Sequence, residues 1–132
     1  MPLVRISLAK GRPAELRRRI GDAVHEALVD AIQIPAADRF QILSEHAAED
    51  LVYDPGYFGI ARTPDIVMIQ ITMSVGRPLE KKRALFRRIA SNLAALGLRR
   101  EDVLVNLVET AWENWSFGNG VASYAPPEST PA

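Results

Sequence analysis

The sequence predicts an α/β fold, also classed as α+β, in which two fused β-α-β units form one mixed four-stranded sheet with two long helices on one face. Short apolar segments of strand length alternate with longer segments of helical periodicity. The order strand, Gly-Arg-Pro, helix, turn, strand also occurs twice, so that Gly11-Arg12-Pro13 matches Gly76-Arg77-Pro78. Because crossovers in β-α-β units are right-handed, both helices are expected on the same face of the sheet.

The first unit, about residues 2–45, begins with a strand over residues 3–8. Pro2 stands directly before the strand formers, and proline suits the first residue of a strand because it has no N–H for the ladder. After Pro13, which suits the first turn of a helix, apolar residues recur at helical spacing to about residue 31. Pro35 ends that segment, Asp38 lies in the following turn, and a second strand is expected over residues 40–44.

The second unit, about residues 66–109, has a strand over residues 66–73, a helix from residue 79 to about residue 96, and a strand over residues 102–109. Gly97 is the expected C-cap of the helix. Between the two units, residues 46–64 carry the turn signal Asp54-Pro55-Gly56, which predicts a hairpin or a long loop.

Equivalent acidic residues follow from this repeat: Asp38 corresponds to Asp102, and Glu45 to Glu109. Residues 1–125 are expected to form a single domain, and the proline-rich residues 126–132 a loose tail. The third and fourth strand segments are nearly continuous apolar runs, typical of strands covered on both faces. Two helices on one side leave the other face of the sheet for further copies of the chain, so an obligate homo-oligomer is expected.

Composition restricts the function classes. The chain of 132 residues has 16 basic and 16 acidic residues, and this balance argues against nucleic acid as the main partner. It has no cysteine, which excludes disulfides, thiolate metal sites and a cysteine nucleophile. No apolar run reaches membrane-spanning length, so a cytoplasmic protein without a membrane partner is expected. No phosphate-binding glycine loop or His-Glu ligand spacing occurs, so no metal or organic cofactor is expected.

Pro2 is the first candidate for chemistry. Proline behind the initiator suits removal of Met1, which would leave a secondary amine on a rigid ring at the end of a strand. Such an amine is able to act as an acid, a base or a nucleophile. The alternative is an ordinary proline at a strand start.

Several separated motifs give the chain a family resemblance. They are Pro2-Leu3 at the start, the stretch Ile34-Pro35-Ala36-Ala37-Asp38-Arg39-Phe40-Gln41, the turn from Ser74 to Arg77, and Trp115-Ser116-Phe117-Gly118. With the β-α-β repeat, they make nearly the whole chain resemble the tautomerase superfamily, in its malonate semialdehyde decarboxylase branch. The resemblance implies a homotrimer and a cofactor-independent lyase. Its reaction would be decarboxylation of malonate semialdehyde or a related β-oxo acid, with hydratase side activity on unsaturated acids.

The resemblance also implies roles for single residues. Pro2 would be the central catalytic group, Asp38 would activate water, and Arg77 would bind the carboxylate of a small carbonyl substrate. The pattern of the branch has two arginines after the third strand, whereas Ser74-Val75-Gly76-Arg77 has one, which leaves the substrate open. The expected aromatic residues of the substrate pocket are Trp115, Phe117 and Tyr124.

Other interpretations stay open at this point. A keto–enol tautomerase of the phenylpyruvate type would use Pro2 as a base, but simple tautomerisation needs no water-activating carboxylate such as Asp38. A non-catalytic trimeric binding module is expected if Met1 is retained. Arg77 is otherwise only the residue before a helix-start proline, and Arg12 is read as an exposed arginine at the equivalent position. His25, at the edge of an apolar stripe, is read as structural.

Overall fold

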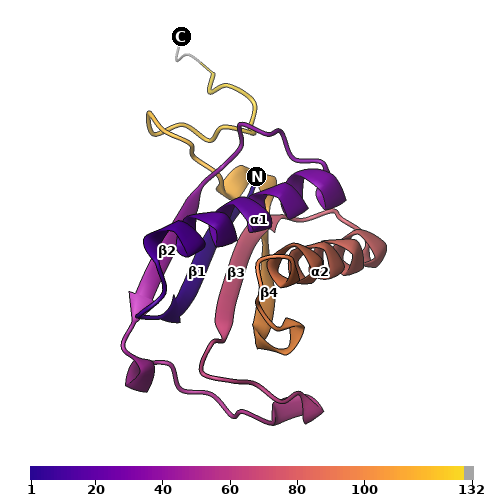
Figure 1. Cartoon of the computed structure of the whole chain (residues 1–132). Helices are drawn as coiled ribbons and strands as arrows, with labels where there is room; N and C mark the ends of the chain where they lie inside the picture. The colour runs from indigo at the N-terminus through magenta and orange to yellow at the C-terminus, as the bar shows by residue number, and fades with distance from the viewer. Residues whose placement is uncertain (130–132) are drawn as a thin grey trace.

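The computed structural model describes residues 1–129, and residues 130–132 of the expected tail lie outside the described residues. Its strands form one mixed sheet in the order β2-β1-β3-β4 (Figure 1). Within each unit the two strands are parallel, while β1 and β3, at the junction of the units, are antiparallel. The predicted fold class is confirmed, with the elements β1 (Leu3–Ala9), α1 (Ala14–Ile32), β2 (Gln41–His46), β3 (Val67–Ser74), α2 (Leu79–Ala94) and β4 (Val103–Thr110).

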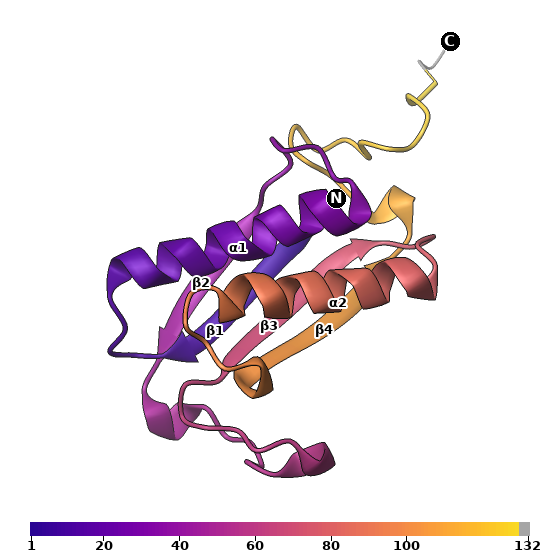
Figure 2. The same ribbon diagram turned by 45° about the vertical axis from the view of Figure 1, so that its right-hand side comes forward.

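Both helices lie side by side across the same face of the sheet, as the handedness of the crossovers predicts (Figure 2). Alternate residues of β1 and β3 point into the layer between sheet and helices and are buried with Leu28 of α1 and Leu85 of α2. Burying a side chain of this size stabilises the fold by about 1.5–3 kcal/mol. None of the helices within residues 1–129 is long and apolar enough to cross a membrane.

The two Gly-Arg-Pro turns have the same backbone geometry. Gly11 has φ of 111° and Gly76 has φ of 117°, a region that only glycine enters at low cost. Pro13 and Pro78 follow as the N-cap residues of α1 and α2, with extended backbones in both cases. The repeat seen in the sequence is therefore also a repeat of conformation.

A matching ion pair joins the helix and the second strand in each unit. Arg17 of α1 lies 2.5 Å from Glu45 of β2, and Lys82 of α2 lies 2.5 Å from Glu109 of β4. Each basic residue stands at the same place after its Gly-Arg-Pro turn, so the predicted equivalence of Glu45 and Glu109 is confirmed.

The second face of the sheet differs from the expectation. In β3, the residues that alternate with the buried ones are Met68, Gln70 and Thr72, so this strand is not apolar on both sides. Gln70 pairs in register with Arg5 of β1 and with Asn106 of β4, which makes a polar row across the middle of the face. The apolar run was broken by Gln70 and Thr72 at alternate positions, and the period of two puts both on the same side.

The described residues 47–64 form a long loop with two short 3₁₀ turns, Ala48–Asp50 and Tyr57–Gly59, and no strand, so the hairpin alternative is wrong. The loop extends from the end of the sheet opposite the N-terminus (Figure 1). Asp102, buried before β4, anchors its return limb by accepting hydrogen bonds from Thr63 N at 2.7 Å and Thr63 Oγ1 at 2.6 Å.

The end of α2 also differs slightly from the expectation. The helix ends at Ala94, and Ala95 is its C-cap with an ordinary right-handed backbone. Gly97 has a positive φ, of 92°. Leu98 N donates to the Leu93 carbonyl oxygen at 3.2 Å, and Gly97 N donates to the Ala94 carbonyl oxygen at 3.0 Å. These two bonds form a Schellman motif with Gly97 in its left-handed position, so the expected capping role of Gly97 is confirmed.

Candidate active site

The N-terminus lies at the end of the sheet where β4 passes into the C-terminal segment (Figures 1 and 2). The Met1 amino nitrogen is 3.7 Å from Oδ2 of Asp38, and Pro2 is buried directly before β1. Asp38 lies in the loop between α1 and β2 and is 7% exposed. Both of its carboxylate oxygens are buried, and neither has a hydrogen-bond partner among residues 1–129. The fold thus brings a terminal amine and an unpartnered carboxylate together.

The charge state of the amino group is set by effects of opposite sign. Burial lowers the pKa of the Met1 amino group, the Asp38 carboxylate raises it, and the Arg77 guanidinium lowers it; the pKa lies below its ordinary value. A lowered pKa increases the fraction of neutral amine near pH 7, the form that acts as a base or a nucleophile. Arg77 therefore belongs to the surroundings of the N-terminus, as the sequence predicts.

Arg77 is oriented by the end of β3. Its Nη1 donates to the Ser74 carbonyl oxygen at 3.2 Å, and the Nε1 of Trp115 donates to the Ser74 hydroxyl oxygen at 2.9 Å. Ser74 is fully buried and so joins the arginine turn to the C-terminal aromatic segment. The sequence prediction assigned no role to Ser74, because a hydroxyl that bridges distant segments leaves no periodic signal.

The aromatic residues form one cluster. Trp115 stacks on Phe117 with ring centroids 5.5 Å apart, and Tyr124 meets Phe117 edge-on at 5.6 Å. Two further rings were not predicted: Trp112 meets Tyr124 edge-on at 4.9 Å, and Phe40 lies 5.8 Å from Phe117. Such pairs stabilise the fold by about 0.5–1.5 kcal/mol each beyond the effect of buried area, so the contacts between the rings hold the cluster together. Phe40 lies in the stretch Ile34–Gln41 that contributes to the family resemblance, and this is the sequence feature from which its place in the site was predictable.

Tyr124 connects this cluster to the charged groups. Burial raises the pKa of the Tyr124 hydroxyl, the Asp38 carboxylate raises it further, and the Arg77 guanidinium lowers it. The hydroxyl oxygen is buried and has no hydrogen-bond partner in the described part of the chain. The same two charges therefore act on the N-terminus and on Tyr124, which places all four groups in one site.

Arg12, the repeat equivalent of Arg77, is at the opposite end of the sheet because β1 and β3 are antiparallel. Its side chain is 13% exposed; its Nη2 lies 3.5 Å from Oδ1 of Asp65 and donates to the Asp65 carbonyl oxygen. The reading of Arg12 as an exposed helix-start arginine is therefore wrong. Asp65 lies just before β3, at the place in the second unit that the N-terminus has before β1 in the first unit. Arg12 therefore has a carboxylate beside it and forms an ion pair.

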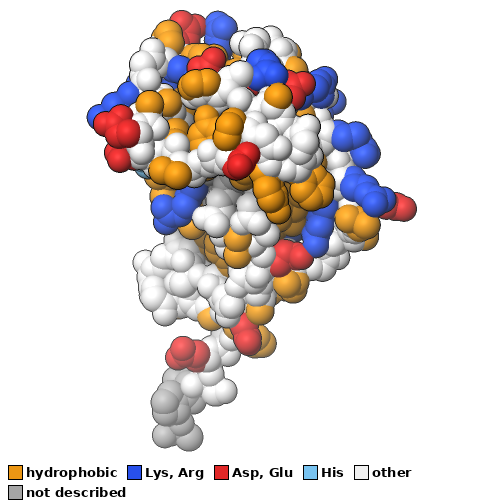
Figure 3. Space-filling model, turned by 90° about the horizontal axis from the view of Figure 1, so that it is seen from below, with side chains coloured by type: hydrophobic (Ala, Val, Ile, Leu, Met, Phe, Trp, Pro, Cys, Tyr) orange, Lys and Arg blue, Asp and Glu red, His pale blue; other side chains and the backbone are white. Residues whose placement is uncertain are grey.

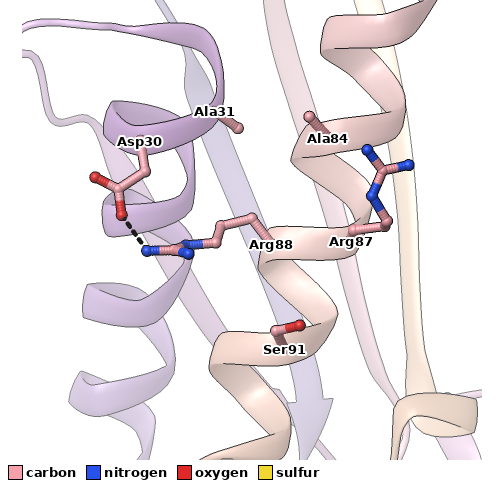
Figure 4. A pocket seen from close by; sticks show the side chains of 6 residues that line it. All are labelled: Asp30, Ala31, Ala84, Arg87, Arg88 and Ser91. Atoms are coloured by element: carbon pink, nitrogen blue, oxygen red, sulfur yellow. Dashed lines mark hydrogen bonds and ion pairs between the residues drawn. The ribbon is translucent and has the colours of Figure 1, made fainter.

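A cavity of about 460 Å³ lies between α1 and α2, away from these residues (Figure 4). In it, Arg88 pairs with Asp30 at 2.7 Å, while Arg87 points away from that pair. None of the predicted site residues lines it. No group of three or more His, Cys, Asp or Glu residues within residues 1–129 is placed to hold a metal ion.

Two sequence families, each described as tautomerase enzyme, match the chain, one over residues 38–118 and the other over residues 2–60. The probable tautomerase YusQ of Bacillus subtilis strain 168 is 37% identical over 92% of this chain and 97% of its own length.

Solved structures agree. The crystal structure of FG41 malonate semialdehyde decarboxylase inhibited by 3-bromopropiolate has a TM-score of 0.88 and 43% identity, covering 92% of this chain and 93% of that one. The wild-type symmetric trimer of Q0 fused 4-OT has a TM-score of 0.76 and 26% identity, covering 93% and 99% of the two chains. The chain therefore belongs to the tautomerase superfamily, in the branch that contains malonate semialdehyde decarboxylase.

Proposed function

We propose that the protein is a cofactor-independent lyase that decarboxylates malonate semialdehyde or a related β-oxo acid with Pro2 as its amino-terminal residue. The observation that carries the proposal is the position of the terminal amine beside Asp38, within the influence of Arg77. The same two charges act on Tyr124 of the aromatic cluster. The 43% identity to FG41 malonate semialdehyde decarboxylase supports it. Removal of Met1 would move the free amine one residue along, to the ring nitrogen of Pro2.

Arg77 would hold the substrate carboxylate, because a guanidinium stays charged and matches a carboxylate with two parallel hydrogen bonds. The amine would activate the β-carbonyl in one of two ways. As an ammonium it donates a hydrogen bond to the carbonyl oxygen; as a neutral amine it adds to the carbonyl carbon and loses water to give an iminium. In either case the bond to the carboxylate carbon breaks, carbon dioxide leaves, and its electron pair moves into an enol or enamine. Protonation at carbon then gives the aldehyde, directly or as an iminium.

Asp38 would supply the water step. Its carboxylate accepts no hydrogen bond from the described residues, so its oxygens are free to accept a proton from a water molecule. That water would hydrolyse the iminium, or would add to an unsaturated acid in a hydratase side reaction. The rings of Trp115, Phe117 and Tyr124 would exclude bulk water, which strengthens the electrostatic interactions inside the site.

Two other functions have specific observations in their favour. The similarity to the probable tautomerase YusQ, together with a single arginine in the turn after β3, favours a keto–enol tautomerase of the phenylpyruvate type with Pro2 as base. Retention of Met1 would instead favour a non-catalytic trimeric binding module, because the Pro2 nitrogen would then be an amide with no basic lone pair.

We also propose that the chain forms a homotrimer. The second face of the sheet has no covering element within residues 1–129, and it exposes 39% of Leu104 and 39% of Val108 between its polar residues. Other hydrophobic side chains are exposed among charged ones, as the view from below shows (Figure 3). Val52 and Phe58 in the long loop are 86% and 84% exposed. The symmetric trimer of Q0 fused 4-OT supports a trimeric assembly.

The test is a comparison of turnover on malonate semialdehyde and on phenylpyruvate. We expect carbon dioxide release that falls by at least about 100-fold in Pro2→Ala and a KM that rises at least about tenfold in Arg77→Gln. Arg12→Gln, at the repeat-equivalent position, is the matched control and should leave both parameters of the folded protein near those of wild type. Turnover of phenylpyruvate alone would replace the proposal by the tautomerase, and turnover of neither would contradict enzymatic use of these acids.

A further inference from the structure

The Asp38 carboxylate is not held in place by its own contacts. Its oxygens accept no hydrogen bond within the described residues, and its nearest charged neighbour is the terminal amine at 3.7 Å. An aspartate in that situation is positioned by its backbone alone. The question is therefore what fixes the loop that carries it, between the end of α1 and the start of β2.

The part of the loop before Asp38 begins at Ile34, which is buried in the core, and a hydrogen bond from one α1 side chain joins the turn that follows. His25 is 9% exposed, and its Nε2 lies 2.8 Å from the carbonyl oxygen of Ala36, two residues before the aspartate. Because a carbonyl oxygen only accepts, Nε2 carries the proton, and the bond exists in both the neutral Nε2–H tautomer and the imidazolium. Asp38 N in turn donates to the Pro35 carbonyl oxygen at 3.0 Å, and this bond closes the turn from Pro35 to Asp38.

The part of the loop after Asp38 has separate attachments. Arg39 Nη2 pairs with Asp22 at 2.6 Å, and Gln41 Nε2 donates to the Gly21 carbonyl oxygen at 2.8 Å. These contacts fix where β2 begins. Between the buried Ile34 and Asp38, the hydrogen bond of His25 is the side-chain contact to α1 that the described residues show.

We propose that His25 is a positioning residue whose Nε2–H holds the turn at Ala36 so that the Asp38 carboxylate stays beside the amino terminus. The proposal rests on the proposed function only in the role given to Asp38. His25 touches neither substrate nor the reacting atoms. It affects the reaction only by fixing the position of the Asp38 carboxylate.

Substitutions separate this role from a general contribution to stability. His25→Gln keeps an N–H donor the same number of bonds from Cα, whereas His25→Leu removes it. Asn92→Leu is the matched control, because Asn92 Nδ2 donates to the Ala23 carbonyl oxygen at 3.0 Å and joins α2 to α1 far from the loop. We expect comparable losses in Tm for His25→Leu and Asn92→Leu.

The deciding readout is the titration of the terminal amine, followed by NMR with isotopically labelled proline in the processed protein. The Asp38 carboxylate raises the pKa of the Met1 amino group, and a carboxylate beside the Pro2 amine should act in the same direction. His25→Leu should therefore lower the pKa of the Pro2 amine toward the value found in Asp38→Asn, while His25→Gln and Asn92→Leu keep the wild-type value. We also expect kcat of His25→Leu to fall at least about tenfold with KM changed less than about twofold, and His25→Gln to recover most of it.

A wild-type titration in His25→Leu, with Tm lowered as in Asn92→Leu, would overturn the proposal. If His25→Leu fails to fold, His25→Asn takes its place: its shorter side chain does not reach Ala36, and an unchanged amine pKa in that variant would overturn the proposal equally. Lack of turnover by the wild-type enzyme would contradict the proposed function but leave the amine titration to decide on His25.

Discussion

Two side chains of opposite charge act on the terminal amine, and their effects on its pKa have opposite signs. The Asp38 carboxylate stabilises the ammonium form, while Arg77 and burial favour the neutral form, and the net effect lowers the pKa. At the residue scale the chemistry of the site therefore depends on a balance. Asp38→Asn removes one of these charges with nearly the same shape, and Arg77→Gln removes the other with a shorter side chain.

We expect Asp38→Asn to lower the pKa of the terminal amine further and Arg77→Gln to raise it. If the ammonium is the active form, Asp38→Asn moves the alkaline limb of the pH–rate profile to lower pH; if the neutral amine is active, it moves the acid limb to lower pH. Direct titration of the amine by NMR, beside the pH–rate profile, checks both signs. A shift of the same sign in the two variants would contradict the account.

Single residues of the site were predictable to different degrees. Pro2 stood out by its place as the second residue before a strand, and Asp38 and Arg77 stood out through the family resemblance of the segments that carry them. Ser74 and Trp112 did not, because their contributions are contacts between segments far apart in the chain: Trp115 Nε1 to the Ser74 hydroxyl, and Trp112 Nε1 to the Val75 carbonyl oxygen. Such contacts depend on the folded geometry and leave no pattern in the order of residues.

The Gly-Arg-Pro turns are the elements that distinguish the two ends of the sheet. Both glycines have φ above 110° and open space where a Cβ would be placed, so alanine there meets a backbone penalty and no clash. The turn at Gly76 precedes a site arginine, and the turn at Gly11 precedes an arginine that is neutralised by Asp65. The two positions are therefore a matched pair within one chain.

We expect Gly76→Ala and Gly11→Ala to lower the free energy of unfolding by similar amounts, about 1–2 kcal/mol each. Only Gly76→Ala should displace Arg77, and it should raise KM for the carboxylate substrate by about tenfold, equivalent to about 1.4 kcal/mol of binding. Urea unfolding and steady-state kinetics on both variants check this. Equal KM values in the two variants would show that the turn does not position the arginine.

The long loop between β2 and β3 depends on Asp102, the repeat equivalent of Asp38. We expect Asp102→Ala to destabilise the fold by about 3 kcal/mol, because it removes two hydrogen bonds to a buried carboxylate and leaves the Thr63 donors without it. Asp54→Ala removes an exposed hydrogen bond in the same loop, from Gly56 N to Oδ1 of Asp54. It should lower the free energy of unfolding by less than about 1 kcal/mol. Denaturant midpoints and slopes of both variants measure the difference. Similar losses would mean that Asp102 is not the anchor.

Elements were predicted well where periodicity was long and poorly where it was absent. Both helices and all four strands were expected close to their observed positions, because their buried residues alternate or recur over several turns. For residues 47–64 both a hairpin and a long loop were expected, because Asp-Pro-Gly predicts a turn but not whether strands flank it. There the conformation is set by Asp102 and other partners outside the loop.

At the scale of the whole molecule, one face of the sheet carries both helices and the other carries a mixed surface. The polar row of Arg5, Gln70 and Asn106 is flanked by Met68, Leu104 and Val108. The sequence argument for assembly relied on apolarity alone, and the alternation of polar residues in β3 made that argument too strong. The proposed trimer rests on the exposed apolar positions and on the trimeric relative.

We expect Leu104→Asp to dissociate the trimer, because it places three charges in a partly apolar interface. Ser91→Asp adds the same charge to the exposed side of α2 and should leave the trimer intact. Analytical ultracentrifugation should give three times the chain mass for wild type and Ser91→Asp, and a smaller mass for Leu104→Asp. A trimer that persists in Leu104→Asp would place the interface elsewhere.

The proposed function requires that Pro2 carries a free, reactive amine in a carboxylate-binding site. The most direct test is the intact mass of the purified protein before and after incubation with a carboxylate-bearing aldehyde and borohydride, for wild type and Pro2→Ala. We expect a wild-type mass lower than that of the translated sequence by one methionine residue. If the neutral amine is the active form, we also expect a reduced adduct, which Pro2→Ala forms at a much lower level. A processed chain without an adduct would restrict Pro2 to acid–base roles, and a retained Met1 would contradict the proposed function.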